Sequence, residues 1–386
     1  MIFTLGFILQ PSSAAEGRDP LAYMDSVEFS LLTCSPHEEV YSLYGHTALR
    51  YHDKRKGRGD FTFNWGVFNF QTPHFVLRFV FGLTDYELGL GSFRPFCNYY
   101  RHWGSAVTEQ VLNLTREEKQ RLSLALGENY QPENRIYRYN YFYDNCSTRP
   151  RDMIERCIDG EIVYDERHDY RPSFREMIHE KTGHHPWATF GNDMLLGVKA
   201  DMKTTRREQE FLPDHLLYDF DHAQIRGADG SWRPLVKERR QPVRPGIQIV
   251  EEEFPLRPMT CALLLLAVSM AIAIVEWRRH HNYIYWDAVL MTAAGVVGCV
   301  LTVMIFSQHP TTSINLQLLL FNPLHLYYLP AVLRRCPSAR HYWRVALPLM
   351  AVLFFLGSLV QHYAEGMTIL ALCLLIRSLI HIRNDK

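Results

Sequence analysis

Several features that this sequence lacks narrow its function before any motif is considered. Lys and Arg together number 41 and Asp and Glu together also number 41, so the basic excess that is typical of nucleic-acid-binding proteins is missing. Its eight cysteines include no CxxC pair and no Cys/His spacing of a zinc site. There is no internal repeat. These absences argue against nucleic acid as a partner and against a bound metal, and no pattern indicates a cofactor.

Charge is also missing from the last third of the chain, because nearly all of it lies before about residue 258. At the other end, residues 2–9 form a short apolar run that small residues follow at 11–15. This pattern resembles the h-region and cleavage site of a secretory signal, although the basic n-region is absent. We expect a truncated signal peptide over residues 1–16, with a buried strand as the alternative. Export would permit a disulfide among Cys34, Cys97 and Cys157, which the sequence does not assign.

The charged part of the chain reads as a mixture of strands and helices. Alternation of apolar and polar residues predicts strands, and capping signals and apolar runs predict helices. The expected strands cover 27–34, 46–52, 61–70, 86–96, 106–112 and the aromatic run 139–143; the expected helices cover 36–43, 73–82, the segment after Thr115 and the segment after Ser147. A Pro-rich, charged stretch over 226–258 is expected to be a linker.

Cys146 stands at the start of a predicted helix, where unpaired N–H groups and the helix dipole favour a thiolate. Acyl-transfer chemistry on a cysteine also needs a histidine and a polar group that orients the imidazole. His46 heads a predicted strand, and Asn64 lies on the next strand, on the face opposite Phe61 and Phe63. The sequence therefore predicts Cys146 as nucleophile, His46 as base and Asn64 as orienting group. A packed cysteine, a core histidine and a turn asparagine are the structural alternatives.

The order of these residues, with histidine 100 positions before cysteine, is similar to that of the circularly permuted branch of the papain-like/NlpC superfamily, which includes lecithin:retinol acyltransferase-like proteins. More narrowly, the chain from about residue 26 to 225 resembles the N-terminal periplasmic domain of the Bacteroidota lipoprotein N-acyltransferase family, Lnb. The segments that carry this resemblance are GHTALR (45–50), FNWGVFNF (63–70), TDYELG (84–89), VLNLTREEKQRL (111–122), YFYDNCSTRPRD (141–152) and PWATFGNDMLLG (186–197). The resemblance implies that His46 and Cys146 are the family's histidine and cysteine.

Five apolar blocks of about membrane-spanning length follow residue 258. They cover residues 259–277, 285–306, 314–333, 345–363 and 367–382. Arginines cluster in the loops at 278–284 and 334–344 and at the C-terminus, which the positive-inside rule places in the cytoplasm. The outer loops carry polar residues, among them His309 and Asn315, which we expect to hold lipid headgroups beneath the exported domain.

Together these patterns predict an α+β, circularly permuted papain-like domain over 26–225, a linker over 226–258 and an all-α transmembrane bundle over 259–386. The resemblance implies an inner-membrane enzyme that faces the periplasm and moves an acyl chain from a phospholipid, through a Cys146 thioester, to the α-amino group of a diacylated lipoprotein. Arg149 and Arg151 are candidates to bind the lipid phosphate, with internal salt bridges as the alternative. Two other functions remain open, namely a membrane-tethered cysteine amidase or peptidase and a non-catalytic lipoprotein-binding accessory.

Overall fold

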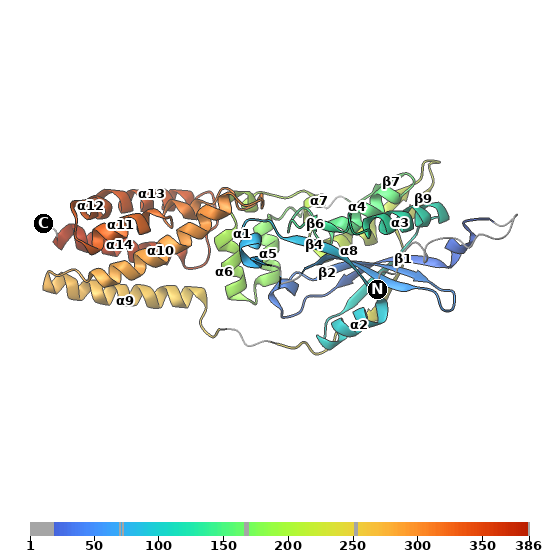
Figure 1. Ribbon diagram of the computed structural model, residues 1–386, viewed down its shortest axis with the longest axis horizontal. Coiled ribbons are helices and arrows are strands. Elements are labelled where there is room, and N and C mark those ends of the chain that lie inside the picture. Colours follow the sequence, from blue (N-terminus) through green and yellow to red (C-terminus); the bar gives the residue numbers. More distant parts are fainter. Residues whose placement is uncertain (1–18, 69–70, 72, 166–169, 251–253, 385–386) are drawn as a thin grey trace. The chain divides into compact units, whose positions relative to one another are not determined.

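The computed structural model describes residues 19–68, 71, 73–165, 170–250 and 254–384. The predicted signal peptide lies outside these ranges. The chain divides into two compact units (Figure 1). The sheet unit contains residues up to 171 together with 204–251, and the helical unit contains 172–203 together with 252–386. The two units are described separately below.

The sheet unit is built on one antiparallel sheet of seven strands in the order β10-β5-β1-β2-β3-β4-β6. The strands are β1 Val27–Cys34, β2 His46–Asp53, β3 Asp60–Val67, β4 Asp85–Ser92, β5 Val107–Leu112, β6 Ile136–Arg138 and β10 Val236–Val243. A second, small sheet contains β7 Glu161–Val163, β8 Gln224–Arg226 and β9 Trp232–Pro234. The helices of this unit are α1 Phe75–Val80, α2 Phe93–His102, α3 Arg116–Asn129, α4 Thr148–Cys157, α7 Arg206–Gln209 and α8 Pro213–His222, with 3-10 turns η2 Ala22–Ser26 and η3 Val40–Ser42.

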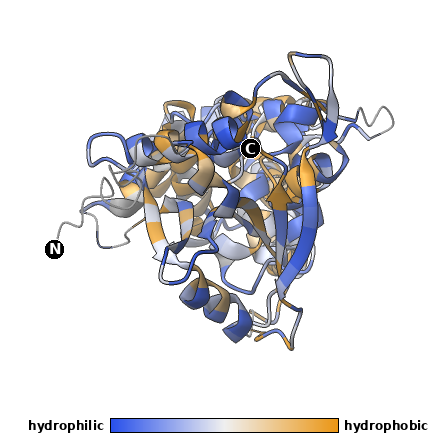
Figure 2. Cartoon of the chain, turned by 90° about the vertical axis from the view of Figure 1, so that its right-hand side faces the viewer, coloured by the Kyte–Doolittle hydropathy of each residue, from blue (hydrophilic) through white to orange (hydrophobic). Residues whose placement is uncertain are grey.

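Apolar side chains cover both faces of the main sheet, which explains why β1 is buried along nearly its whole length. One face packs against α3, α4 and α8 in a core that includes Phe29, Leu31 and Trp65. The other face packs against α2, in a smaller core around Leu32, Cys34, Cys97 and Tyr100. Figure 2 shows hydrophobic residues on some strands and helix faces, and hydrophilic residues on the outer loops and on the long strand at the right of the view. Burying apolar surface on both faces is the main driving force for this arrangement.

Several predicted elements form as expected, and three do not. The strand predicted over 86–96 ends at Ser92, and α2 begins at Phe93 because Phe93, Phe96, Cys97 and Tyr100 recur with helical spacing on one buried side. The aromatic run 139–143 is a turn closed by a bridge between Asn140 and Asp144, while the neighbouring strand is β6. The helix predicted over 36–43 is only the short turn η3.

The stretch over 226–258, expected as a linker, also differs from the prediction in its first part. Residues 236–243 form β10, which pairs with β5 at one edge of the main sheet. Pro242 is accommodated because the pairing shifts register between Arg240 and Val243, and proline is tolerated at edges and bulges. The charged residues of this strand resemble those of a linker, but charge on an edge strand is a common way to prevent unwanted pairing.

The helical unit consists of helices and turns in its described residues. They are α5 Phe174–Thr182, α6 Pro186–Leu195, η4 Val198–Asp201, α9 Pro258–Arg279, α10 Ile284–Ile305, η5 Leu316–Leu319, α11 Leu324–Leu333, α12 Pro337–His341, the π-helical turn η6 Tyr342–Ala346, α13 Leu347–Gly357 and α14 Met367–Asn384. Four segments in the described ranges are long and apolar enough to cross a membrane: 258–279, 284–305, 316–333 and 367–384. The remaining predicted span, 345–363, lies on a helical run that continues through α12, η6 and α13 and ends at Gly357.

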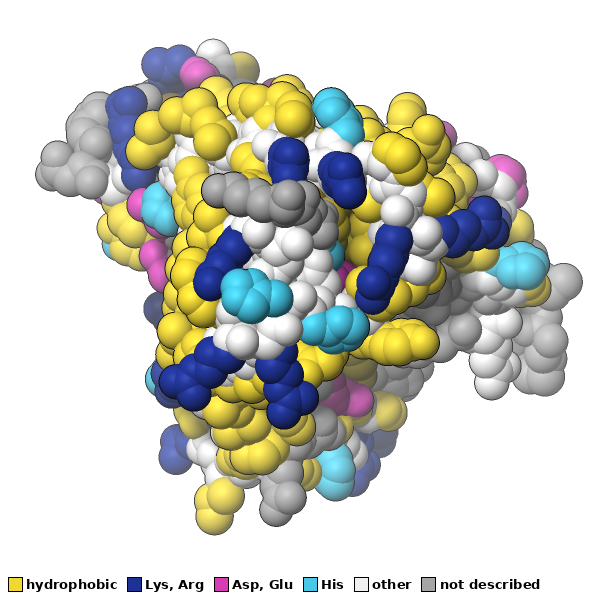
Figure 3. Space-filling model, turned by 90° about the vertical axis from the view of Figure 1, so that its left-hand side faces the viewer, with side chains coloured by type: hydrophobic (Ala, Val, Ile, Leu, Met, Phe, Trp, Pro, Cys, Tyr) yellow, Lys and Arg dark blue, Asp and Glu magenta, His cyan; other side chains and the backbone are white. Residues whose placement is uncertain are grey.

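One end of the helical unit carries most of its positive charge. Lys and Arg side chains gather there among hydrophobic ones (Figure 3). Inside this end, the fully buried Arg377 of α14 donates to Asp287 of α10 (Nε–Oδ1 2.6 Å) and to Glu276 of α9 (Nη2–Oε1 2.7 Å). His381 contacts the second carboxylate oxygen of Asp287 at 2.8 Å. Three helices are therefore joined by a single buried ionic network.

Residues 172–203 pack on the loops of the helical unit that were predicted to be outside. Asn315 donates to the carbonyl of Met194 at 2.8 Å, and Gln317 donates to that of Asp193 at 3.0 Å. Gln361 donates to the carbonyl of Leu196 at 3.0 Å and to Asn315 Oδ1 at 3.0 Å. The backbone N–H groups of residues 197 and 198 donate to carbonyls at 311 and 314. The excursion 172–203 is thus held by hydrogen bonds from side chains that are themselves buried.

Candidate active site

Cys146 lies in the turn that precedes α4, two residues before the first residue of that helix. Its side chain is half-buried. Asn145, which is 97% buried, organises the turn: its Oδ1 accepts from the N–H groups of Ser147 (2.8 Å) and Thr148 (3.0 Å). Its Nδ2 donates to the carbonyls of Tyr141 (2.9 Å) and Phe211 (2.8 Å). Every polar atom of the Asn145 amide therefore holds the backbone around the cysteine.

This arrangement decides which backbone donors are open to a ligand. The N–H of Asn145 donates to Thr148 Oγ1 at 2.8 Å, and the N–H of Arg149 donates to the carbonyl of Asn145. With the N–H groups of 147 and 148 also engaged, the N–H of Cys146 itself is the one donor of residues 145–149, all of them described, for which no acceptor is found. A donor next to the nucleophile is where an oxyanion is stabilised.

His46 is the first residue of β2 and is also half-buried. Gly45 precedes it with a φ of +76°, and a Cβ at that position would lie 2.7 Å from the carbonyl oxygen of Cys34. Glycine is needed there because both the backbone conformation and the close approach exclude a side chain. The turn therefore places the imidazole at the start of β2, the central strand of the sheet.

Asn64 lies on β3, beside the start of β2, and its Oδ1 is 3.3 Å from His46 Nε2. The amide is oriented by two further contacts, from Nδ2 to the carbonyl oxygen (3.4 Å) and the hydroxyl oxygen (3.3 Å) of Thr62. Because Asn64 occupies Nε2, the other ring nitrogen of His46 is left for the thiol. The structure thus brings together the three residues that the sequence selected, in the order Cys146, His46, Asn64.

The thiolate of Cys146 and the imidazolium of His46 stabilise each other. Burial disfavours the thiolate, but the neighbouring imidazole and its hydrogen bond to the sulfur outweigh burial, so the pKa of Cys146 lies below its ordinary value. The Thr47 N–H and the Ser147 hydroxyl contribute in the same direction. Burial also disfavours the imidazolium, yet the interaction with Cys146 and the hydrogen bond to Asn64 raise the pKa of His46. A thiolate–imidazolium pair is what this geometry favours.

The space beside the thiol is bordered by Gly66 and Tyr139. Gly66 has a φ of +93° at a register shift between β3 and β4, and a Cβ there would lie 3.8 Å from Cys146 Cβ and 3.5 Å from the Tyr139 ring. Tyr139 stacks on Tyr86 with ring centroids 4.2 Å apart. Burial, followed by the nearby Cys146, raises the pKa of Tyr139 far above its usual range, so the phenol stays neutral. Tyr139 was not predicted as a residue near the site, because residues 139–143 were expected to form a strand and form a turn instead.

The two arginines of α4 that were candidates for phosphate binding take part in internal contacts. Arg149 forms a two-point ion pair with Asp144 (2.6 and 2.8 Å) and lies over the ring of Tyr137, 3.4 Å from its centroid. Arg151 is 96% buried and donates to Glu210 (2.8 Å) and to the carbonyl of Arg207 (3.0 Å). Arg151 is therefore closed off from a lipid phosphate. It forms an internal salt bridge with Glu210, which was the predicted alternative.

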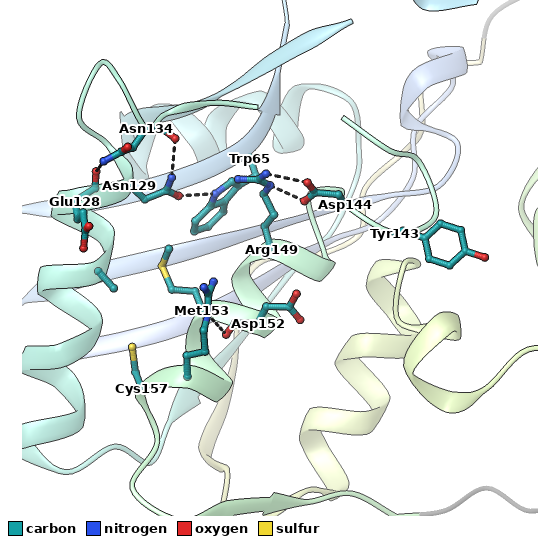
Figure 4. Close-up of a pocket in the computed structure, with 12 residues that line it drawn as sticks. Trp65, Glu128, Asn129, Asn134, Tyr143, Asp144, Arg149, Asp152, Met153 and Cys157 are labelled. Atoms are coloured by element: carbon teal, nitrogen blue, oxygen red, sulfur yellow. Dashed lines mark hydrogen bonds and ion pairs between the residues drawn. The ribbon is translucent and has the colours of Figure 1, made fainter. Parts of the chain in front are cut away.

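Arg149 borders a cleft of about 770 Å³ between α3 and α4 (Figure 4). Trp65 and Met153 contribute apolar surface to its wall. Asn129 accepts a hydrogen bond from the Trp65 indole N–H at 3.0 Å, and Asp144 faces Arg149 across the upper part of the view. Cys146 is not among the residues that line this cleft, so the cleft and the thiol are separate features of the sheet unit.

His309 and Asn315, the predicted headgroup contacts, lie in the helical unit. His309 is half-buried in the loop after α10. Asn315 is 94% buried, and its amide oxygen accepts from the N–H of Gln317 and from Gln361 while its amide nitrogen binds Met194. These polar atoms hold protein backbone, so Asn315 has an internal partner for each side of its amide. Among the described residues, no group of three His, Cys, Asp or Glu side chains is placed to hold a metal ion.

Comparison with known families agrees with the two-part architecture. Residues 22–179 match the Lnb N-terminal periplasmic domain, and residues 249–386 match the Lnb transmembrane domain. No curated protein and no solved structure matches the chain significantly. Fold and site together define a membrane protein with a periplasmic α+β domain that carries a paired cysteine and histidine. This chain belongs to the Lnb family.

Proposed function

We propose that this protein is a lipoprotein N-acyltransferase that uses Cys146 as its nucleophile. Membership of the Lnb family points to lipoprotein processing at the membrane. The observation that carries the chemistry is the linked set of Cys146, His46 and Asn64, in which the pKa of the thiol is lowered and the imidazole is oriented. These are the parts that an acyl-cysteine intermediate requires.

In the first half-reaction the Cys146 thiolate attacks an ester carbonyl of a phospholipid. The N–H of Cys146 stabilises the oxyanion of the tetrahedral intermediate. His46, as imidazolium, gives its proton to the departing alkoxide when the C–O bond breaks, which releases a lysophospholipid and leaves a thioester on Cys146. Asn64 holds the ring so that the transferred proton lies between the sulfur and the leaving oxygen.

In the second half-reaction the α-amino group of a diacylated lipoprotein attacks the thioester carbonyl. The neutral His46 takes a proton from the attacking amine, the C–S bond breaks, and the sulfur leaves as thiolate. An amide has formed and the enzyme has returned to its starting state. Because one sulfur serves donor and acceptor in turn, we expect ping-pong kinetics.

The proposal extends to the membrane arrangement. We propose five spans, with the arginine-bearing loops and the C-terminus in the cytoplasm and the α+β domain in the periplasm, where the amino group of an exported lipoprotein is available. We assign no substrate contact to Arg151 because its guanidinium is buried and paired. Lipid contact by His309 remains a proposal.

Mass spectrometry of a reporter lipoprotein tests the function directly. Cells with the wild type should yield triacylated reporter, and cells with Cys146→Ala or His46→Ala should accumulate the diacylated form. Asn64→Ala should lower the rate about tenfold, because loss of the hydrogen bond that orients His46 should raise the activation free energy by roughly 1.4 kcal/mol. Intact-protein mass after incubation with phospholipid should reveal one acyl adduct that Cys146→Ala abolishes. Triacylated reporter from Cys146→Ala cells would exclude this mechanism, and a peptide fragment as product would favour the amidase alternative.

A further inference from the structure

The segment between β3 and β4 presents a group of large apolar side chains on the surface of the sheet unit. We call this group the α1 lip; it consists of Val67, Leu77, Phe79, Phe81 and Leu83. The exposed fraction of these side chains ranges from 36% for Leu83 to 58% for Leu77. The five residues fall within 17 consecutive positions around α1. Five exposed apolar side chains in one short segment favour an interaction surface, whereas isolated exposed apolar residues do not.

The charged side chains that border the lip are paired, with two arginines sharing one aspartate. Arg78 lies on the same helix, and its guanidinium pairs with Asp85 at the start of β4. Asp85 also pairs with Arg138 at 3.0 Å. The charged groups that border the lip are therefore bound to each other. A surface that recognises a charged polypeptide would present unpaired charge. A surface that contacts hydrocarbon avoids the free-energy cost of desolvating such a charge when it presents none.

Aromatic side chains lead from the lip toward the thiol. Phe68 follows Val67, and its ring centroid is 5.1 Å from that of Tyr86. Tyr86 stacks on Tyr139 at 4.2 Å, and Tyr139 borders the space beside Cys146. Aromatic faces provide large apolar contact area at low conformational cost. These ring contacts connect the residue next to Val67 with the ring that borders the space beside Cys146, and an acyl chain has the apolar surface to match them.

We propose that the α1 lip contacts the acyl region of a lipid bilayer, and that the rings of Phe68, Tyr86 and Tyr139 guide one acyl chain from it to Cys146. The bilayer is the occupant because the same chain contains membrane-spanning helices, which keep the sheet unit near lipid whatever other partner is present. The identity of the guided chain as acyl donor rests on the proposed function. Contact with lipid does not.

Lipid contact is measured with the full-length protein reconstituted in vesicles that contain brominated phospholipids. In the Leu77→Trp variant the added fluorescence, after subtraction of the wild-type signal, should be quenched by at least half. The matched control is Leu124→Trp, on α3, where the leucine is 61% exposed but isolated from the lip. Equal quenching of the two variants, or none at position 77, overturns the proposal; the second result would indicate a protein partner for this surface.

Guidance is measured by the rate at which Cys146 gains an acyl adduct from two donors. With phospholipid in the vesicle bilayer, Leu77→Asp and Phe81→Asp should each slow the adduct at least tenfold, while Leu124→Asp should leave it unchanged. With a water-soluble short-chain ester, all three variants should react within twofold of the wild type. Equal slowing with both donors overturns guidance. If the wild type gains no adduct from either donor, the proposed acyl transfer fails and guidance fails with it, while the quenching result still decides lipid contact.

Discussion

The hydroxyl of Thr47 lies 2.8 Å from the hydroxyl of Ser147, across a sequence separation of 100 residues. Each of these residues directly follows a residue of the candidate site, so one buried hydrogen bond joins the head of β2 to the turn before α4. This bond ties together the two backbone segments that carry His46 and Cys146.

We therefore expect Thr47→Val and Ser147→Ala each to slow acylation of Cys146 roughly fivefold to tenfold, because each removes a hydrogen bond worth about 1 kcal/mol. Ser147→Ala also removes a hydroxyl that lowers the pKa of Cys146, so it should be the slower single variant, and the double variant should be little worse than Ser147→Ala alone. Adduct formation followed by intact mass gives the three rates. Fully additive effects would mean that the two hydroxyls position the site independently.

The pH dependence of Cys146 alkylation should report its pairing with His46. The lowered pKa of the thiol predicts that iodoacetamide reacts with Cys146 along a profile whose midpoint lies below the ordinary thiol value of about 8.5. In His46→Ala the imidazolium is lost and burial remains, so the midpoint should move above that value. Peptide mass spectrometry separates Cys146 from the other seven cysteines. An unchanged midpoint in His46→Ala would contradict the ion pair.

Asn145 should matter for stability as much as for chemistry. Asn145→Ala leaves two buried N–H groups and two carbonyls without their partner, so we expect a loss of about 2–3 kcal/mol in the free energy of unfolding. Asn145→Asp keeps the acceptor but turns a carboxylate oxygen toward two carbonyls, so it should be no better. Thermal unfolding in detergent gives the values. Asn98→Ala, at an exposed asparagine of α2, is the matched control and should change little.

The buried network around Arg377 makes a prediction for the helical unit. Arg377→Met leaves the carboxylates of Glu276 and Asp287 buried without their cation, which should cost about 3–5 kcal/mol of stability. Replacing both acids as well, with Glu276→Gln and Asp287→Asn, should restore much of the loss. The control is Arg278→Met, at an exposed arginine in the last turn of α9, which should change stability little. Failure of the triple variant to recover would mean that packing, rather than charge, is what Arg377 supplies.

Gln317 allows a test of how the excursion 172–203 is held. Gln317→Leu removes donors to the carbonyls of Asp193 and Met194 and the acceptor for the N–H of Ala364. We expect amide hydrogen exchange in residues 193–198 to accelerate at least tenfold, while exchange in α10 stays unchanged. Unchanged exchange in 193–198 would show that the remaining hydrogen bonds are sufficient.

Elements whose sequence signals are local formed as predicted. The capping box of Thr115 and Glu118 and the alternation after His46 are local patterns, and both elements form as predicted. The helical spacing of Phe93, Phe96, Cys97 and Tyr100 was present but hidden in an aromatic run that also suits a strand.

The candidate site was predictable in its three main residues because their types and order are specific. Their surroundings were not, because they depend on tertiary contacts. The use of Asn145 Oδ1 by two N–H groups removes donors that a helix start ordinarily offers, and no pattern in the sequence reveals it. Similarly, Asn315 and Gln317 read as an open polar surface, whereas their partners are the backbone of a segment about 120 residues earlier.

The path of residues 172–203 has a consequence for how this protein can be divided. The chain leaves the sheet unit at residue 171, contributes two helices to the other unit, and returns at 204 to supply α7, α8 and β10. No single cut therefore separates the two units: a fragment ending at 225 would keep α6 but lose the loops to which it binds, and would also lose an edge strand of its own sheet. The two units are interleaved along one polypeptide, so gene fusion or domain exchange cannot recombine them as modules.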